Sequence, residues 1–273
     1  MSVEKYSVLM TVYGGEKPEF LKESLSSMLN QTLPPEQLVL ACDGELTPEL
    51  YSVIDSFSRK YGEVFEPLFL PENKGNAYAA NRGLEKCRCE FVVRMDSDDI
   101  SLPERCRKQV KLMEENPELD ISGAYIREFD SETGEFISVK KTPPGHEEIL
   151  EYSRRRNPFN NQTIIMRKSR ALKIGGYSEL RRCEDYDFAC RLLMDGAKGA
   201  NIPEVLVNYR VTPENYQRRS NWANTRDFIS VRLLNFKRGY CSLWDFLTAS
   251  LMQIFIFLMP KKLTGAIYKK FLR

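Results

Sequence analysis

The sequence is poor in histidine and contains no long apolar run. His146 is the single histidine among 273 residues, which argues against a metal site built from cysteine and histidine. The seven cysteines are odd in number and scattered, a pattern that favours reduced thiols over a disulfide framework. No stretch reaches the ~18 apolar residues of a membrane-spanning helix, and the polar start predicts no signal peptide. We therefore expect a cytoplasmic protein.

The chain also lacks the motifs of two large classes of nucleotide-binding protein. The fingerprint Gly-x-Gly-x-x-Gly is absent, as is a phosphate loop that ends in Gly-Lys-Ser or Gly-Lys-Thr. A hydride-transferring dehydrogenase and a phosphate-loop ATPase are thereby excluded. A calcium loop that begins at Asp96 is excluded too, because Ser101 and Arg107 stand where it requires glycine and glutamate.

Charge is distributed unevenly along a chain of ordinary composition. Hydrophobic residues make up 42% and charged residues 29%, as in a typical globular protein. The first 204 residues carry 28 Lys and Arg against 35 Asp and Glu, whereas the residues from Val205 onward carry 12 against 3. An acidic body with a basic tail indicates that the tail meets phosphate or an anionic surface.

Short apolar runs alternate with amphipathic segments over the first hundred residues. This alternation predicts an α/β fold, with a mostly parallel sheet covered by helices on both faces. Ligands bind such sheets at the carboxyl ends of the strands. The expected strands cover residues 7–12, 38–42, 64–70 and 91–95, and the expected helices cover 18–31, 47–61 and a segment that ends near Lys86.

The second half is less regular. The last expected helix begins with Glu184-Asp185-Tyr186-Asp187, which places acids on its first turn. Favourable interaction with the helix dipole would explain these acids without a catalytic role, and both explanations stay open at this point. The expected strands here cover residues 121–129, 136–140 and 162–166, and the expected helices cover 147–156 and 184–195.

Three carboxylates follow the apolar run 91–93 closely. Asp96, Asp98 and Asp99 would repel one another unless a cation neutralised them. In an extended chain the side chains of Asp96 and Asp98 project to the same side and can face one ion. Ligands that are all oxygen favour a hard cation such as Mg²⁺ or Mn²⁺. The alternative is a solvated acidic turn ahead of a helix that begins near Pro103.

Six groups of short motifs occur between residues 7 and 187. They are Ser-Val-Leu-Met-Thr-Val-Tyr (7–13), Asp43-Gly44, Asn73-Lys74-Gly75 with Ala80-Asn81-Arg82-Gly83, Arg-Met-Asp-Ser-Asp-Asp (94–99), Gly175-Gly176-Tyr177 and Glu184-Asp185-Tyr186-Asp187. In kind and order they resemble the family-2 inverting glycosyltransferases with the GT-A fold, a Rossmann-like α/β fold. Within that family the chain is similar to bacterial exopolysaccharide and capsule transferases of the amylovoran-biosynthesis type.

The resemblance implies a UDP-sugar donor and assigns residues to it. Thr11, Tyr13 and Asp43 would hold the nucleoside, with Asp43 accepting a hydrogen bond from the uracil imide. Further donor contacts would come from Lys74, Gly75, Asn81, Asp96 and Ser97.

The resemblance also implies the metal and the catalytic group. Asp98 would bind Mg²⁺ or Mn²⁺ between the donor phosphates, with Asp96 contacting the same ion or the ribose. Asp185 would be the general base that deprotonates the acceptor hydroxyl, and Glu184 would be a supporting carboxylate. Arg210 would support the site near the diphosphate, with a solvated loop as the alternative.

A catalytic domain and a tail are expected. Residues 1–220 would form the GT-A domain, with a nucleotide-binding half (1–100) and an acceptor-binding half (101–220). The resemblance implies a hexose, galactose as a first guess, transferred to a polyprenyl-diphosphate-linked glycan in bacterial surface-polysaccharide synthesis. Nucleic acid is not an expected partner.

The tail, residues 221–273, is basic and apolar. Its apolar stretch 246–259 is too short to span a bilayer, and lysines alternate with apolar residues after Pro260. This pattern predicts an interfacial helix on the inner face of the cell membrane. The alternative is packing on the catalytic body or on a second subunit, as in a homodimer.

Two other functional classes are weaker matches. A sugar-nucleotide nucleotidyltransferase would carry a glycine-rich, arginine-containing loop after the first strand, where this chain reads Tyr-Gly-Gly-Glu-Lys-Pro. A non-catalytic relative that only binds carbohydrate or nucleotide would be favoured by loss of the acids at 98 and 185, and both are present.

Overall fold

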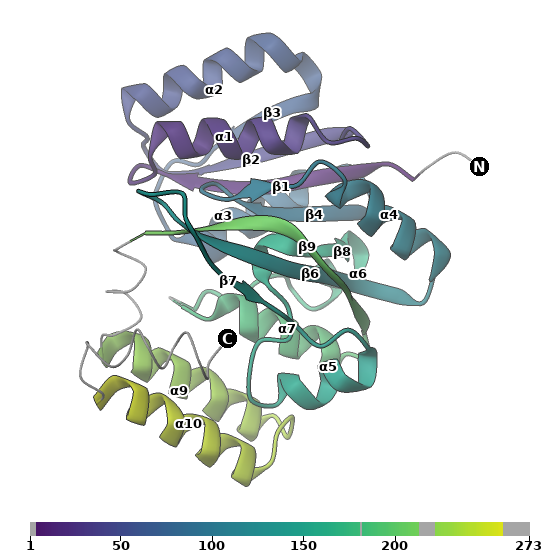
Figure 1. Cartoon of the computed structure of the whole chain (residues 1–273), viewed down its shortest axis with the longest axis vertical. Helices are drawn as coiled ribbons and strands as arrows, with labels where there is room; N and C mark the ends of the chain where they lie inside the picture. Colours follow the sequence, from purple (N-terminus) through teal and green to yellow (C-terminus); the bar gives the residue numbers. More distant parts are fainter. Residues whose placement is uncertain (1–3, 181, 213–221, 259–273) are drawn as a thin grey trace.

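The computed structural model describes residues 4–180, 182–212 and 222–258, and within them nine strands form one sheet (Figure 1). The strand order is β3-β2-β1-β4-β8-β6-β9-β5, with β7 paired to β6 outside this path. The strands are β1 (Tyr6–Tyr13), β2 (Gln37–Asp43), β3 (Phe65–Phe69), β4 (Phe91–Asp96), β5 (Ile100–Ser101), β6 (Leu119–Asp130), β7 (Phe136–Lys140), β8 (Ile165–Arg167) and β9 (Lys198–Val211).

Helices lie on both sides of this sheet. They are α1 (Pro18–Leu29), α2 (Pro48–Tyr61), α3 (Asn76–Lys86), α4 (Arg105–Glu115), α5 (His146–Ser153), α6 (Lys168–Lys173), α7 (Glu184–Met194), α9 (Trp222–Lys237) and α10 (Leu243–Leu258), with 3₁₀ turns η1 (Gly62–Val64) and η2 (Asn161–Thr163). Two of the helices start at a proline, which is pre-organised for the first helical position: α1 at Pro18 and α2 at Pro48.

The first four strands are parallel, as the alternation predicted. β1 lies between β2 and β4, with Tyr13 opposite Asp43 and Thr11 opposite Asp96. The carboxyl ends of three strands therefore meet at one edge of the sheet, where a ligand site is expected.

Side chains of β1 alternate between two hydrophobic cores. Val8 and Met10 pack in the core under α1, α2 and α4, whereas Leu9 belongs to the core that α3 and α7 cover. Gly83 lets α3 approach the sheet closely, because a Cβ at this position would lie 2.4 Å from the Leu9 side chain. This close approach brings the start of α3 to the edge where β1 and β4 end.

The second half departs from the sequence-based prediction in several places, and α6 was not expected at all. The expected strand 162–166 begins as the turn η2 and becomes β8 only at Ile165, and the helix expected to reach residue 156 ends at Ser153. β9 was expected only as a strand of unspecified bounds before Arg210, because its polar start and Pro203 break any alternation, and in the structure it continues past Arg210. Its register against β6 shifts between Ile202 and Val205, so a bulge accommodates the proline.

The helices α9 and α10 form a hairpin that packs on α7 (Figure 1). The rings of Phe236 and Phe246 stack across the hairpin with centroids 5.9 Å apart, and Val231 joins a small core with Tyr186 and Cys190 of α7. The start of the predicted tail thus packs on α7, as the alternative to membrane association expected, whereas the lysine-rich part of the predicted interfacial segment, after Pro260, lies outside the described residues. Within 4–180, 182–212 and 222–258, no helix has both the length and the apolar character needed to cross a bilayer.

Candidate active site

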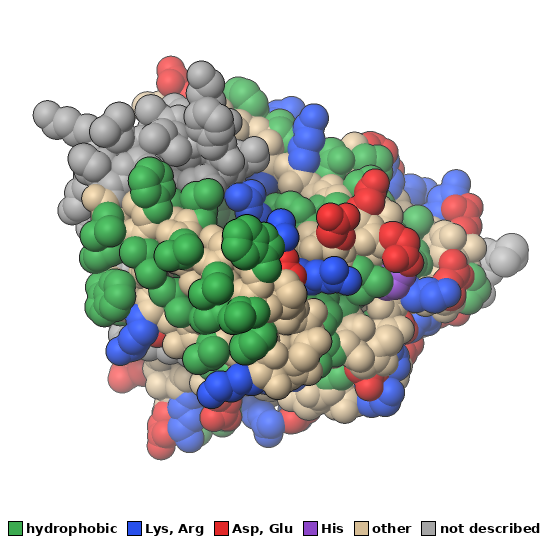
Figure 2. Space-filling model, turned by 90° about the horizontal axis from the view of Figure 1, so that it is seen from below, with side chains coloured by type: hydrophobic (Ala, Val, Ile, Leu, Met, Phe, Trp, Pro, Cys, Tyr) green, Lys and Arg blue, Asp and Glu red, His purple; other side chains and the backbone are tan. Residues whose placement is uncertain are grey.

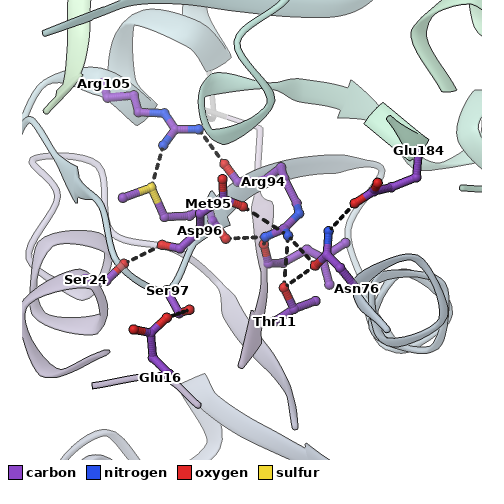
Figure 3. A network of polar contacts seen from close by, with 11 residues as sticks. Thr11, Glu16, Ser24, Asn76, Arg94, Met95, Asp96, Ser97, Arg105 and Glu184 are labelled. Carbon is purple, nitrogen blue, oxygen red and sulfur yellow. Dashed lines mark hydrogen bonds and ion pairs between the residues drawn. The ribbon is translucent and has the colours of Figure 1, made fainter. Parts of the chain in front are cut away.

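A buried arginine lies beside the acidic end of β4 (Figure 3). Arg94 is 1% exposed, and its guanidinium lies 3.1 Å from an Asp96 carboxylate oxygen. The same group donates to Thr11 Oγ1 at 2.9 Å and to Asn76 Oδ1 at 3.2 Å. Thr11 also donates to Asn76 Oδ1, at 2.7 Å. These bonds hold the ends of β1 and β4 against the first residue of α3.

The network continues to the first turn of α7. Asn76 Nδ2 donates to Glu184 Oε1 at 2.9 Å, across 108 positions of sequence. Burial, and then the charge of Asp185, raises the pKa of Glu184, while the bond from Asn76 acts in the opposite direction. The acidic turn of α7 therefore belongs to the same polar cluster as Asp96.

Asp185 is held at both of its oxygens. Asn157 Nδ2 donates to one at 2.9 Å, and the backbone N–H of Tyr186 donates to the other at 2.8 Å. Burial raises the pKa of Asp185 above its ordinary value, although the Tyr186 bond, the charge of Lys140 and the Asn157 bond each lower it. A half-buried carboxylate with a raised pKa and unused acceptor capacity is suited to general-base catalysis.

The backbone ahead of these acids is strained. Cys183, the residue before α7, has a φ of 61°, in the left-handed region that residues other than glycine seldom adopt. Strain of this kind concentrates at functional sites. The dipole explanation for the α7 acids is therefore incomplete, because Glu184 and Asp185 also have specific side-chain partners from distant elements.

Asp187, the last acid of this turn, has a structural role. It is fully buried and accepts from Ser178 Oγ at 2.7 Å, Arg191 Nε at 2.7 Å and Arg238 Nη1 at 2.6 Å. Since Arg238 follows α9, Asp187 connects the body to the α9–α10 hairpin.

Arg210 supports the turn after β4. Its backbone N–H donates to Asp99 Oδ1 and its Nε donates to the backbone carbonyl of Asp98, both at 2.8 Å, while its guanidinium pairs with Glu23. Burial, followed by the charges of Asp98 and Asp96, raises the pKa of Asp99 well above its ordinary value. Arg210 lies within β9, so the solvated-loop alternative is wrong.

Asp43 braces the loop that precedes α3. Its two carboxylate oxygens accept the backbone N–H groups of Lys74 and Gly75, both at 2.9 Å. Gly75 has a φ of 98°, a backbone conformation that would be strained for any residue with a side chain. Each Asp43 oxygen retains a second lone pair, so a bond from the uracil imide stays a prediction.

Three other residues assigned to the donor line the same edge. Tyr13 is half exposed at the end of β1. Ser97 donates to Glu16, which joins the loop after β1 to the turn after β4. Lys74 Nζ pairs with Glu72 at 3.2 Å on the surface.

Asn81 has a structural role in addition to the donor contact assigned to it, which stays a prediction. Its amide donates to the Tyr177 carbonyl and accepts from the Tyr177 N–H, both at 2.7 Å. A Cβ on Gly176, whose φ is 69°, would lie 2.3 Å from Asn81 Oδ1. Asn81 therefore positions the Gly175-Gly176-Tyr177 turn, and its amide retains a second N–H and a second lone pair.

A pocket of about 230 Å³ lies between the start of α3 and the start of α7. The pocket brings together residues of the loop before α3 and residues of the acidic first turn of α7, which the sequence separates by about a hundred positions. The lining residues are Lys74, Gly75, Asn76, Ala77, Glu179, Leu180 and Glu184.

Three functional residues escaped the sequence-based assignment. Arg94 could have been suspected, because it is a charge inside an otherwise apolar strand directly before the acids. Asn157 opens the stretch Asn-Pro-Phe-Asn (157–160), which is part of the family resemblance but implied no role for it, and Asn76 carries no such signal, since its partners come from distant parts of the sequence.

The carboxylates after β4 fit a hard cation that would be shared with a substrate. In the described part of the chain, no three side chains of His, Cys, Asp or Glu form a group able to hold a metal. Asp96 and Asp98 offer carboxylates at the strand end, and Asp96 is already paired with Arg94. Mg²⁺ is often held by one or two carboxylates together with substrate phosphates. The residues are therefore compatible with a metal–diphosphate complex and not with a cage made of protein alone.

Comparison with known proteins identifies the family. The family described as Glycosyl transferase family 2 matches residues 7–175. The chain belongs to this family. A UDP-Gal:alpha-D-GlcNAc-diphosphoundecaprenol beta-1,3-galactosyltransferase from Escherichia coli is 35% identical over 269 residues, which are 98% of this chain and 97% of that relative. The amylovoran biosynthesis glycosyltransferase AmsE from Erwinia amylovora is 33% identical and covers 97% of this chain and 98% of its own length.

A solved structure supports the architecture. The crystal structure of S. aureus TarS in complex with UDP superposes with a TM-score of 0.59 at 18% identity, over 83% of this chain and 65% of that one. A likeness at this identity concerns the fold. The predictions of the family, of a glycosyltransferase and of the GT-A fold are confirmed.

Proposed function

We propose that the protein is an inverting glycosyltransferase that moves a hexose, with galactose as the first candidate, from a UDP-sugar to a polyprenyl-diphosphate-linked oligosaccharide. The product would be an intermediate of a bacterial surface polysaccharide. The relatives support this substrate class, since one is named for UDP-Gal and a diphosphoundecaprenol acceptor and another for amylovoran biosynthesis.

The observation that carries the proposal is the polar cluster between β4 and α7. Asp96 at the end of the nucleotide-binding half is linked through Arg94 and Asn76 to Glu184, next to Asp185. An inverting transferase needs this juxtaposition, because the attacking hydroxyl and the leaving diphosphate must lie on opposite sides of one sugar carbon.

Asp185 acts as the general base. Its carboxylate accepts the proton of the acceptor hydroxyl while that oxygen forms a bond to the anomeric carbon and the bond from this carbon to the UDP oxygen breaks. Asn157 and the Tyr186 N–H hold the carboxylate in place during the transfer. Because burial raises the pKa of Asp185, the group is a stronger base than an exposed aspartate.

Asp98, assisted by Asp96, would hold Mg²⁺ or Mn²⁺. Such an ion, when bound, would act as a Lewis acid and neutralise charge on the departing diphosphate. Arg210 keeps the Asp98–Asp99 turn in place through the backbone carbonyl of Asp98 and the carboxylate of Asp99.

The proposed acceptor also implies where in the cell the protein works. A polyprenyl-linked glycan lies at a membrane, so the proposal includes peripheral association with the inner face of the cell membrane through residues 221–273.

Calorimetric titration with UDP, GDP and CDP, each with Mn²⁺ and with EDTA, tests the donor site first. We expect UDP alone to bind, and EDTA to remove most of the affinity. Asp98→Ala should bind UDP equally weakly with and without Mn²⁺, whereas Asp120→Ala, an acid at the start of β6 paired with Arg170, should bind like the wild type. Metal-dependent binding of GDP or CDP would discard the uridine assignment, and no binding of any nucleotide would favour a non-catalytic relative.

The sugar and acceptor are tested by transfer. UDP-galactose, UDP-glucose and UDP-N-acetylglucosamine are each supplied with a synthetic lipid-diphosphate glycan, and the anomeric configuration of the product is read by NMR. The proposal expects one preferred donor and inversion. Retention of configuration would overturn the single-displacement mechanism.

A further inference from the structure

The hairpin of α9 and α10 presents a broad apolar face to solvent. Figure 2 views the molecule from the side on which the hairpin lies and displays a patch of hydrophobic side chains there. Several are more than half exposed, with Trp244 at 69%, Phe255 at 61% and Leu258 at 71%. The patch, which we call the hairpin face, comprises Trp222, Leu243, Trp244, Leu247, Leu251, Met252, Phe255 and Leu258.

The polarity of α10 is the reverse of that of a helix packed on a protein in water. Its fully buried residues are Asp245 and Ser250, whereas its leucines, Trp244 and Phe255 are exposed and Phe246 stacks on Phe236 of α9. Asp245 is bonded to Arg155 at 2.6 Å and to Ser242 Oγ at 2.7 Å. Asp245 thus anchors the first turn of α10 to Arg155, and the exposed apolar side remains for an apolar partner.

Basic residues border the hairpin face. The Arg155–Asp245 pair fixes the run Arg154-Arg155-Arg156 beside the first turn of α10, and Lys237 is exposed at the end of α9. Figure 2 also has Lys and Arg side chains at the edge of the hydrophobic patch. Directly after Leu258, the remaining sequence holds five Lys and Arg and no acidic residue.

We propose that the hairpin face is a membrane-docking surface that lies in the plane of an anionic bilayer. The outward side chains of α10 would enter the boundary between headgroups and acyl chains, and the arginines would meet lipid phosphates. A second copy of the chain is the weaker occupant, because a symmetric contact would bring the two basic borders together. Trp244 suits an interface that is apolar on one side and wet on the other. The purpose of docking rests on the proposed lipid-linked acceptor, but its test needs neither donor nor acceptor.

Fluorescence gives a direct test, because both tryptophans of the chain, Trp222 and Trp244, lie on the hairpin face. In the full-length variant Trp222→Phe, Trp244 is the single reporter. We expect its emission to shift to the blue with vesicles that contain phosphatidylglycerol, and to be quenched by brominated acyl chains. An emission that vesicles leave unchanged would overturn the proposal.

A matched pair of charge insertions tests the location. Phe255 on α10 and Phe136 on β7 are exposed to 61% and 63%, so either can be replaced without disturbing a core. Phe255→Glu should weaken partition into anionic vesicles by at least about tenfold, because one apolar anchor becomes a charge. Phe136→Glu should bind vesicles like the wild type. Equal loss in both variants would contradict a site on α10.

A separate experiment tests the arginines that border the hairpin face. The double variant Arg154→Glu with Arg156→Glu should lose most of the preference for anionic over neutral vesicles while Arg155 keeps its bond to Asp245. Sedimentation tests the competing occupant. If the protein forms a dimer that Phe255→Glu dissociates, and does not bind vesicles, the hairpin face belongs to a second copy.

Transfer to a short water-soluble acceptor tests the enzymatic proposal separately. Transfer without docking would refute only the docking surface, and docking without transfer only the function.

Discussion

Asn157 donates a hydrogen bond of 2.9 Å from its side-chain amide to a carboxylate oxygen of Asp185. Asn157 follows α5, and its own Oδ1 accepts the backbone N–H of Phe159 at 3.2 Å. The side-chain amide of Asn157 is thus held by its own loop as well as by Asp185 of α7. Asn157 therefore positions the proposed base and lowers the pKa that burial has raised.

Replacement of Asn157 should move the pH dependence of transfer. Asn157→Asp keeps an acceptor for Phe159 but removes the donor and adds a negative charge, so the pKa of Asp185 should rise further. Because a base must be deprotonated, the acidic limb of the kcat/KM profile should shift to higher pH, while activity on the alkaline side recovers toward that of the wild type. A profile measured with saturating metal checks this.

The control is Asn30→Ala, since the Asn30 side chain bonds only to the Ser26 carbonyl of its own helix. Its profile should coincide with that of the wild type. Equal loss of activity at every pH in Asn157→Asp would contradict a role in tuning the base.

Asp185→Asn should separate chemistry from binding. An amide cannot accept the proton of the acceptor hydroxyl, so transfer should fall by about 10²- to 10⁴-fold, the usual contribution of a general base. UDP affinity should remain close to that of the wild type, because Asp185 lies on the α7 side of the site. Glu184→Gln, which keeps an acceptor for Asn76, should cost much less. Near-native turnover of Asp185→Asn would remove Asp185 from the mechanism.

The sequence was sufficient for the part of the fold that local pattern determines. Apolar runs and helix starts identified the four parallel strands, and their shared carboxyl edge followed from topology. The bounds of β9 escaped prediction because its polar start and Pro203 interrupt the pattern, and a bulge against β6 accommodates the proline. Such a strand has no alternation to detect.

The residues of the candidate site also fall into those that the sequence revealed and those that it did not. Acids at strand and helix ends were visible as motifs, whereas the partners that hold them were not. Asn81 is an example: its motif implied a donor contact, whereas its bonds to the backbone of Tyr177 had no signal in the sequence. Contacts between residues so far apart in sequence depend on the finished fold.

Asn76 should couple stability to donor binding. Asn76→Ala removes the acceptor shared by Thr11 and Arg94 and the donor to Glu184. We expect a loss of about 2 kcal/mol in the free energy of unfolding, because partly buried charged groups lose a partner. The KM for the donor should rise as well, since Asn76 lines the pocket. Urea denaturation and initial rates measure the two effects, and unchanged values for both would show that the network is dispensable.

Asp187 should stabilise the hairpin in a pH-dependent way. Burial alone would raise the pKa of Asp187, but the bonds from Ser178, Arg238 and Arg191 outweigh it, and the pKa lies below its ordinary value. A carboxylate whose folded pKa is depressed contributes stability above its unfolded pKa of about 4, and this contribution disappears as the pH falls through the folded pKa.

Asp187→Asn should therefore lower the free energy of unfolding by about 3 kcal/mol at pH 7, because the buried Asp187 carboxylate is the shared partner of two arginines. The difference from the wild type should shrink as the pH falls from about 4 through the depressed folded pKa, because Asp187 becomes protonated first in the unfolded state. Asp195→Asn is the matched control, since Asp195 also pairs with two bases, Lys173 and Arg170, but on the surface. It should have a much smaller effect. A constant difference between wild type and Asp187→Asn from pH 7 to pH 3 would mean that the amide disrupts packing rather than charge.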